Sequence, residues 1–154
     1  MNEAELDELP SFLNDDEKNY IQTRVNNQIN WYDSSSLKAQ KYYRLLSLTT
    51  LIVSAIIPFF TNLAIDNFWI KLIVSLLGVI ATLCQGILSL NKYNENWIGY
   101  RTVCETLKKE KYMFLTKAGV YGESNSSFSF FTERIESVIS QENVNWASLN
   151  KSNK

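Results

Sequence analysis

The chain has 154 residues, with 15 Lys and Arg against 16 Asp and Glu, which is the length of a single domain with a formal net charge of −1. The absence of histidine excludes a Ser–His or Cys–His nucleophile, and the near-neutral charge gives no support for nucleic-acid binding. The two cysteines are too few for a metal cage and the five glycines match no phosphate-binding loop, so we expect no cofactor, no metal and no enzyme activity.

The N-terminal region divides into a tail and an amphipathic helix. Residues 1–14 are acidic and lack helical periodicity, so we expect a flexible tail with one turn around Phe12. Residues 15–32 begin with three carboxylates, which suit the positive end of a helix dipole, and their apolar positions recur at helical spacing. The following residues 33–36, Asp-Ser-Ser-Ser, are able to break or re-cap this helix before a second one begins at about Leu37.

Two apolar segments without charge follow, at residues 45–65 and 72–90. An α-helix crosses a hydrocarbon core of about 30 Å in roughly 20 residues, so each segment is long enough to span it. Both lack charged side chains on every face, whereas a helix at the surface of a soluble domain has a charged or polar face. We therefore predict an all-α integral membrane protein, a hairpin with spans at about 45–65 and 70–90 and a lipid bilayer as its surroundings.

The basic residues predict the orientation of this hairpin. They gather on its two outer flanks: Lys38, Lys41, Arg44, Lys92 and Arg101. The linker between the spans holds Lys71, which Asp66 offsets. Because cytoplasmic flanks carry the Lys and Arg excess, we expect a location in the inner (plasma) membrane with both termini in the cytoplasm.

An apolar seam follows the second span. Its members alternate spacings of four and three, with Lys111 in the one gap: Tyr93, Trp97, Tyr100, Cys104, Leu107 and Phe114. Traced backwards, the same face meets Leu90, Gly86, Leu83, Val79, Leu76 and Leu72. We expect one helix over about 70–117, with 91–117 in the cytoplasm. Its partner is either the helix at 15–32 or another subunit.

The C-terminal region predicts one more helix. Gly119 and Gly122 should end the preceding helix, and residues 119–127 resemble a loop. Apolar residues then form one face of a helix over about 128–143. We take 15–146 as a single helical domain and 147–154 as a polar tail.

Polar side chains form a stripe on each predicted span. The main members on the first are Ser47, Thr50 and Ser54, and those on the second are Ser75, Thr82, Gln85 and Ser89. Three interpretations remain open: close helix packing, a water-filled pore between several subunits, or chance, since Ser and Thr can bond to the preceding turn. Gln85 is the most informative, because exposing its carboxamide to lipid would cost several kcal/mol. It must face another helix, another subunit or water.

The segments outside the spans resemble a known family. They are NQINWYD, KAQKYYR, NENWIGYRTVCETLKKEKYMF, VYG, FFTERIESVI and QENVNW. In order and spacing they are similar to the bacterial domain of unknown function 4231, in the wider SLATT (SMODS- and SLOG-associated two-transmembrane) group, over about residues 20–146. The matching residues are Trp31, Tyr32, Trp97, Arg101, Glu105, Leu107, Glu110, Tyr121, Glu136, Glu142 and Trp146.

This resemblance implies a membrane hairpin with cytoplasmic helices. It also implies a pore-forming or membrane-perturbing effector of a bacterial conflict or defence system, triggered by a separate nucleotide-sensing protein. We expect a homo-oligomer, because two helices cannot enclose a water-filled path or fully shield Gln85.

A second interpretation of the shared residues is structural. The aromatic residues clamp helices together: Trp31, Tyr32, Trp97 and Tyr100. Glu105 and Glu110 belong to a solvated face with i,i+4 pairs, of which Arg101 with Glu105 is one. The alternative function is a non-conducting membrane anchor or scaffold for a cytoplasmic partner.

Overall fold

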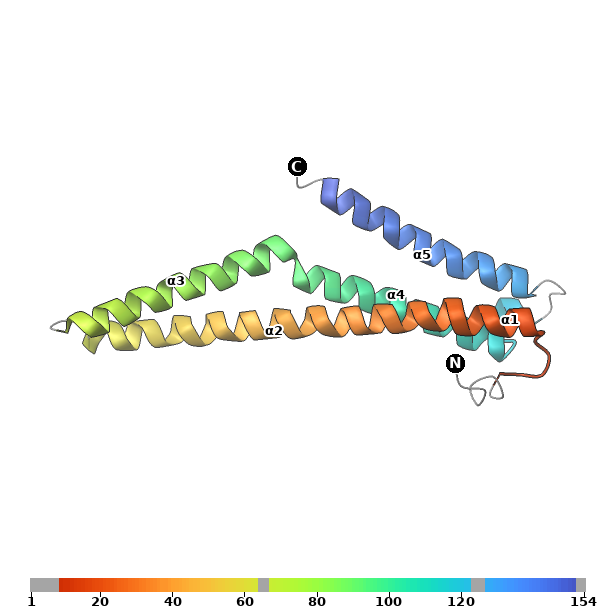
Figure 1. Ribbon diagram of the computed structural model, residues 1–154, viewed down its shortest axis with the longest axis horizontal. Coiled ribbons are helices and arrows are strands. Elements are labelled where there is room, and N and C mark those ends of the chain that lie inside the picture. Colours follow the sequence, from red (N-terminus) through yellow and green to blue (C-terminus); the bar gives the residue numbers. More distant parts are fainter. Residues whose placement is uncertain (1–8, 64–66, 123–126, 152–154) are drawn as a thin grey trace. The chain divides into compact units, whose positions relative to one another are not determined.

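The computed structural model describes residues 9–63, 67–122 and 127–151. The described part of the chain is helical and contains no strand, which confirms the predicted all-α class (Figure 1). The elements in order are α1 (Asp15–Asn19), the π-helix η2 (Tyr20–Val25), α2 (Asn26–Leu63), α3 (Phe68–Asn91), α4 (Tyr93–Leu115), the 3-10 helix η3 (Gly119–Tyr121) and α5 (Ser127–Lys151).

The chain divides into two compact units. Ser35–Ile98 forms the first, which we call the hairpin unit, because it holds most of α2 and all of α3. The segments before and after it form the second, the terminal unit, which holds α1, η2, the start of α2, most of α4, η3 and α5. The two units are described separately below.

The terminal unit begins with a capped helix. The Asn14 side chain accepts a hydrogen bond from the Glu17 N–H at 2.8 Å, and the Asn14 N–H donates to Glu17 Oε2 at 3.0 Å. This capping box confirms the predicted helix start. The turn around Phe12 is also present, with the Leu13 N–H bonded to the Pro10 carbonyl. Leu13 is buried in the core, so this end of the predicted tail is packed.

The predicted break at residues 33–36 is wrong, because α2 continues through all four. Two of the four side chains make hydrogen bonds that leave the helical backbone intact. Ser34 Oγ donates to the Trp31 carbonyl of the same helix at 3.0 Å. Asp33 accepts from Arg101 on α4 instead of capping a new helix. Ser36 is buried, and its hydroxyl makes no hydrogen bond with the described residues. None of these side chains caps a new helix, so the backbone ladder of α2 continues.

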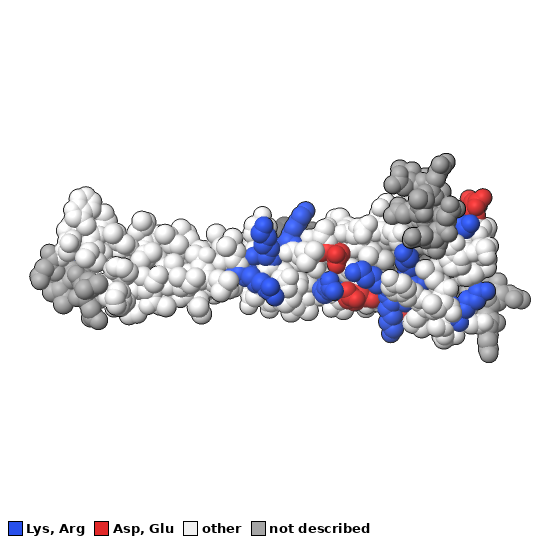
Figure 2. Space-filling view, turned by 90° about the horizontal axis from the view of Figure 1, so that it is seen from below, with Lys and Arg blue, Asp and Glu red and all other residues white. Residues whose placement is uncertain are grey.

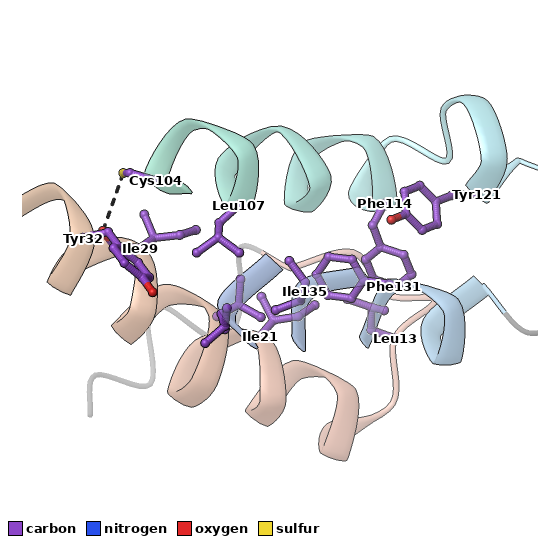
Figure 3. Packing of buried hydrophobic residues seen from close by; sticks show 12 residues of the cluster. Leu13, Ile21, Ile29, Tyr32, Cys104, Leu107, Phe114, Tyr121, Phe131 and Ile135 are labelled. Atoms are coloured by element: carbon purple, nitrogen blue, oxygen red, sulfur yellow. Dashed lines mark hydrogen bonds between the residues drawn. The ribbon is translucent and has the colours of Figure 1, made fainter. Parts of the chain in front are cut away.

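The core of the terminal unit is formed mainly by the N-terminal helix, α4 and α5, to which Leu13 and Tyr121 of η3 add (Figure 3). Its buried members are Leu13, Ile21, Val25, Ile29, Tyr32, Cys104, Leu107, Phe114, Tyr121, Phe131, Ile135 and Ile139. The apolar faces predicted over 15–32 and 128–143 therefore meet the seam of α4. Of the two partners considered for that seam, the structure shows the chain's own N-terminal helix, and it adds α5 as a third element.

One continuous helix over 70–117 was predicted, and this prediction is wrong. Lys92 has a left-handed conformation, with φ of 47°, and separates α3 from α4. The Asn96 side chain donates to the Asn91 carbonyl at 3.0 Å and so satisfies an acceptor at this break. A left-handed residue redirects the chain, so the apolar face cannot pass unchanged from one helix to the next.

The less exposed face of α3 is not the one that the sequence predicted. Its less exposed residues include Ile70, Val74, Leu77, Ala81, Cys84 and Leu88, again with alternating spacings of four and three. The face that the sequence predicted is exposed instead: Leu72, Leu76, Val79, Leu83 and Leu90. The seam of α4 is therefore not an extension of the covered face of α3.

The left-handed Lys92 gives a first testable prediction. A side chain in this conformation costs about 1–2 kcal/mol, and glycine avoids most of that cost. We expect Lys92→Gly to raise the free energy of unfolding by about 1 kcal/mol. The matched control is Lys38→Gly inside α2, which should lower it by about 1 kcal/mol. Thermal unfolding of the detergent-solubilised chain checks both, and destabilisation by Lys92→Gly would contradict the left-handed geometry.

The C-terminal end of α4 lies before the predicted glycines. The Ala118 N–H donates to the Met113 carbonyl at 2.9 Å and the Lys117 N–H to the Phe114 carbonyl at 3.1 Å, which is a Schellman motif. Lys117, with φ of 52°, occupies the position that is most often glycine. After η3, α5 extends to Lys151, beyond the predicted end at 143 and into the predicted polar tail.

The described residues contain two helical stretches that are long and apolar enough to cross a membrane. They are Asp15–Thr61 and Phe68–Tyr121, whose most apolar windows have mean hydropathies of 1.7 and 2.1. Neither window is buried within the chain. On the face shown in Figure 2, charged side chains are absent from most of the visible hairpin unit.

Candidate functional site

The two predicted polar stripes both lie in the hairpin unit. On α2, Ser47 and Thr50 are half-buried and Ser54 is exposed. The second stripe is exposed throughout on α3: Ser75, Thr82, Gln85 and Ser89. The second stripe therefore does not lie on the less exposed face of α3. Its side chains are accessible to a second molecule or to solvent.

Three hydroxyl groups of these stripes bond to their own helix. Thr50 Oγ1 donates to the Leu46 carbonyl at 2.9 Å. Ser75 Oγ donates to the Lys71 carbonyl at 3.0 Å, and Thr82 Oγ1 to the Gly78 carbonyl at 2.9 Å. These hydroxyls are satisfied without another helix or water, which favours the chance interpretation for these three residues.

Gln85 differs from the hydroxyl residues of the stripe. Within the described part of the chain, its carboxamide makes no hydrogen bond, and the residue is exposed on α3. The group has two donors and two acceptors, and the preceding turn cannot satisfy them all. Gln85 is therefore the stripe residue that most needs a partner outside the single chain.

An aromatic cluster joins α2 and α4 in the terminal unit. The Trp31 ring contacts Tyr32 edge to face at 4.9 Å and Tyr100 at 5.6 Å. Tyr32 is buried and Trp31 is half exposed. This supports the predicted role of Trp31 and Tyr32 as a helix clamp, which Tyr100 completes. Trp97 belongs to the hairpin unit and is half-buried there.

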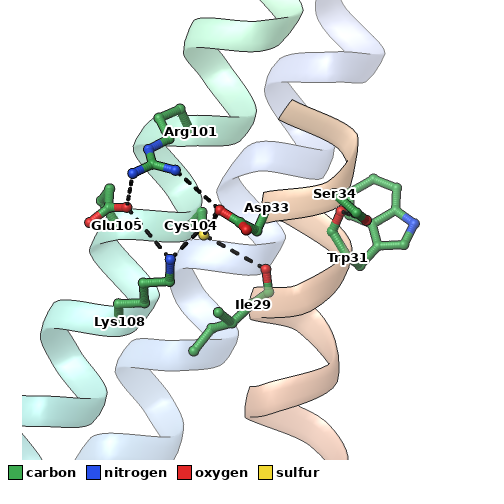
Figure 4. Close-up of polar contacts among 8 residues, drawn as sticks. All are labelled: Ile29, Trp31, Asp33, Ser34, Arg101, Cys104, Glu105 and Lys108. Atoms are coloured by element: carbon green, nitrogen blue, oxygen red, sulfur yellow. Dashed lines mark hydrogen bonds and ion pairs between the residues drawn. The ribbon is translucent and has the colours of Figure 1, made fainter. Parts of the chain in front are cut away.

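Asp33 is the centre of an ionic cluster between α2 and α4 (Figure 4). Arg101 Nη1 donates to Asp33 Oδ1 at 3.1 Å, and Arg101 Nη2 lies 2.8 Å from Glu105 Oε1. Lys108 Nζ lies 3.7 Å from both carboxylates. The predicted Arg101–Glu105 pair is thus confirmed, while the role of Asp33 was missed. All four side chains are partly exposed, so each pair adds little stability by itself.

Cys104 lies beneath this cluster. Its Sγ is 3.7 Å from the Ile29 carbonyl oxygen and 3.7 Å from Asp33 Oδ1. Burial raises the pKa of the Cys104 thiol, and the Asp33 carboxylate raises it further, although Lys108 opposes them. At neutral pH the group is therefore a thiol, which packs as a small apolar side chain.

Glu110 was expected on a solvated face, and this expectation is wrong. The residue is 4% exposed and connects three elements. The Tyr121 hydroxyl of η3 donates to Glu110 Oε2 at 2.6 Å, and Arg134 Nη2 of α5 donates to Oε1 at 2.7 Å. Burial, followed by the hydrogen bond to this carboxylate, raises the pKa of Tyr121, so its hydroxyl remains a donor. The shared residues Glu110 and Tyr121 therefore hold the terminal unit together.

A second carboxylate attaches α5 to η2. Arg24 donates to Glu136 through Nε at 2.9 Å and through Nη2 at 2.8 Å, and the Tyr20 hydroxyl donates at 3.0 Å. These hydrogen bonds lower the pKa of Glu136, and the one from Arg24 has the largest effect. The sequence singles out Glu136 but not these partners. The side chains of Glu142 and Trp146 lie outside the described part of the structure.

The lowered pKa of Glu136 gives a prediction for acid pH. The ionised Glu136 stabilises the fold fully above the ordinary carboxyl pKa of 4.5. This stabilisation is lost as the pH falls through the lower pKa that Glu136 has in the folded protein. We expect Glu136→Gln to lower the stability at neutral pH and to remove this part of the acid-induced loss. Denaturant unfolding at a series of pH values checks it, with the exposed Glu133→Gln as control. The same acid dependence in both variants would contradict the assignment.

The fold and these contacts define an all-helical protein with two helices that are long and apolar enough to cross a membrane, and with a helical core formed by its two ends. Residues 27–129 match the family described as protein of unknown function (DUF4231), and the chain belongs to this family. No curated protein and no solved structure gives a significant match.

Proposed function

We propose that this chain is a SLATT-type two-span membrane protein that assembles with copies of itself in the inner membrane. There it acts as a pore-forming or membrane-perturbing effector of a bacterial nucleotide-linked defence system. The observation that carries the assembly is the exposed carboxamide of Gln85 among apolar side chains on α3. The defence role rests on the family resemblance, which also implies that a separate nucleotide-sensing protein supplies the trigger.

The exposed apolar surface of the hairpin unit supports insertion into a bilayer. Leu76 and Leu83 on α3 are 59% and 60% exposed, and Leu51 on α2 is 67% exposed. An apolar surface of this length is a liability in water but is well solvated by lipid chains. Phe59, Phe68 and Trp69 lie near the turn of the hairpin and are also exposed, as in an aromatic belt at a membrane surface.

Gln85 then requires more than one copy. A carboxamide facing lipid loses several kcal/mol of hydrogen bonding. Because one hairpin leaves this group exposed, it is satisfied either by a second copy or by water inside a ring of copies. The exposed Ser89 and Thr82 lie within a turn of Gln85, so a ring would present the whole polar stripe to the same water.

Thiol labelling tests the orientation of the spans. We expect Asn67→Cys to react with a membrane-impermeant reagent on spheroplasts, and Val120→Cys to react only after lysis. Both sites are exposed, and the background carries Cys84→Ala and Cys104→Ala. The reverse pattern would overturn the orientation, and labelling of both sites on sealed cells would overturn the two-span topology.

Release of a trapped dye from liposomes that carry the purified protein tests the pore. Native mass spectrometry of the same preparation gives the number of copies. The proposal expects an oligomer that releases dye, alone or with a nucleotide-sensing partner. A strict monomer at all concentrations would remove the pore, and an oligomer that never conducts under any of these conditions would favour the anchor or scaffold.

A further inference from the structure

A polar groove of about 440 Å³ lies within the terminal unit, between residues 22–30 and α4. The lining residues are Gln22, Thr23, Asn26, Asn27, Ile29, Asn30, Lys108, Lys111 and Tyr112. All but Ile29 carry a polar group, and the volume suits a small molecule. Nothing in the pore proposal uses this groove.

The lining carries positive charge and no carboxylate. Both lysines are half-buried. Lys111 Nζ donates to Asn26 Oδ1 at 2.8 Å, which fixes the ammonium against the wall of the groove. Lys108 is held less tightly, at 3.7 Å from Asp33 and Glu105 beside the groove. Burial alone would lower the pKa of Lys108, but the surrounding Cys104, Asp33 and Glu105 raise it overall, so the group is charged at neutral pH.

These groups are mostly donors. An ammonium has three N–H donors, and each asparagine adds two from its carboxamide. A phosphate group offers several acceptor oxygens and negative charge, which such a set can bind through charge-assisted hydrogen bonds. The Tyr112 ring, 66% exposed, adds an apolar wall for the rest of a ligand. We propose that this groove binds a molecule that carries a phosphate group.

Isothermal titration of the detergent-solubilised full chain with inorganic pyrophosphate tests this site at physiological salt. We expect saturable binding to the wild type, and about tenfold weaker binding for Lys108→Gln and for Lys111→Gln, because each removes a charge-assisted hydrogen bond. The matched control is Lys109→Gln, an exposed neighbour outside the groove that should bind like the wild type.

A parallel titration with short-chain phosphatidylglycerol distinguishes the two sources of a phosphate group. Binding of pyrophosphate would assign the groove to soluble phosphates, and binding of that lipid alone would assign it to lipid headgroups. Two results would overturn the proposal: no binding of either probe, or an equal loss in all three variants, which would indicate general attraction of anions. The titration does not depend on conduction, so a negative dye-release result would leave the groove proposal untouched. A negative titration would likewise leave the pore proposal untouched.

Discussion

Replacing Phe131 by Ala is expected to lower the free energy of unfolding of the terminal unit by about 3–5 kcal/mol. The side chain is fully buried, and its ring stacks on Phe114 with centroids 4.4 Å apart. It also contacts the rings of Tyr121 and Phe128. Truncation leaves a cavity where α4, η3 and α5 meet, and the surrounding rings cannot close it fully.

The neighbouring Phe130→Ala is the control, because its ring is 38% exposed and lies at the edge of the core. We expect it to cost about 1 kcal/mol, from partial loss of apolar burial and of the contact with Arg134. Denaturant unfolding of the full chain in mild detergent, followed by circular dichroism, compares the two variants. Equal losses would contradict the packing of α5 on this core.

Replacing Arg134 by Met is expected to cost about 2–3 kcal/mol, because it leaves the buried carboxylate of Glu110 without its cation. The estimate is below the usual loss for a fully buried pair, since the Arg134 side chain is 44% exposed. Tyr121 still donates one hydrogen bond to the carboxylate, which limits the loss further. The same unfolding measurement gives the value.

A second substitution shows whether the cost comes from the unpaired charge. Glu110→Gln combined with Arg134→Met removes the charge while keeping an acceptor for the Tyr121 hydroxyl. We expect the double variant to recover part of the stability that Arg134→Met alone loses. Losses that simply add would show that Glu110 and Arg134 act independently, contrary to their 2.7 Å contact.

The sequence predicted the helices well but not where they are interrupted. Helical periodicity and the length of an apolar segment are local properties of the sequence. They therefore predicted helices over 15–32 and in both apolar segments. The break at Lys92 has no glycine or proline to mark it, and a left-handed lysine is rare. Conversely, the Asp-Ser-Ser-Ser run at 33–36 predicted a break, because Asp and Ser favour helix ends. The sequence did not reveal that Asp33 accepts a hydrogen bond from Arg101 on α4.

The polar contacts were predictable only where they are local. Arg101 and Glu105 are four residues apart on one helix, so their pairing followed from spacing. The partners of Glu136 come from the other end of the chain, and no local pattern reveals them. For Glu110 a signal did exist, because Leu107, Glu110 and Phe114 follow the spacing of the buried face of α4. A carboxylate on such a face indicates a buried partner, not a solvated position.

Dye release by Gln85→Leu, with native mass spectrometry of the same liposome preparation, tests the central claim most directly. If copies of Gln85 surround water, leucine leaves the oligomer intact but reduces or abolishes release, because an apolar ring can lose its water and close. The control Gln85→Asn retains the carboxamide and should keep conducting. Unchanged release by the leucine variant at unchanged oligomer mass would contradict the pore, whereas loss of the oligomer would show that Gln85 joins helices.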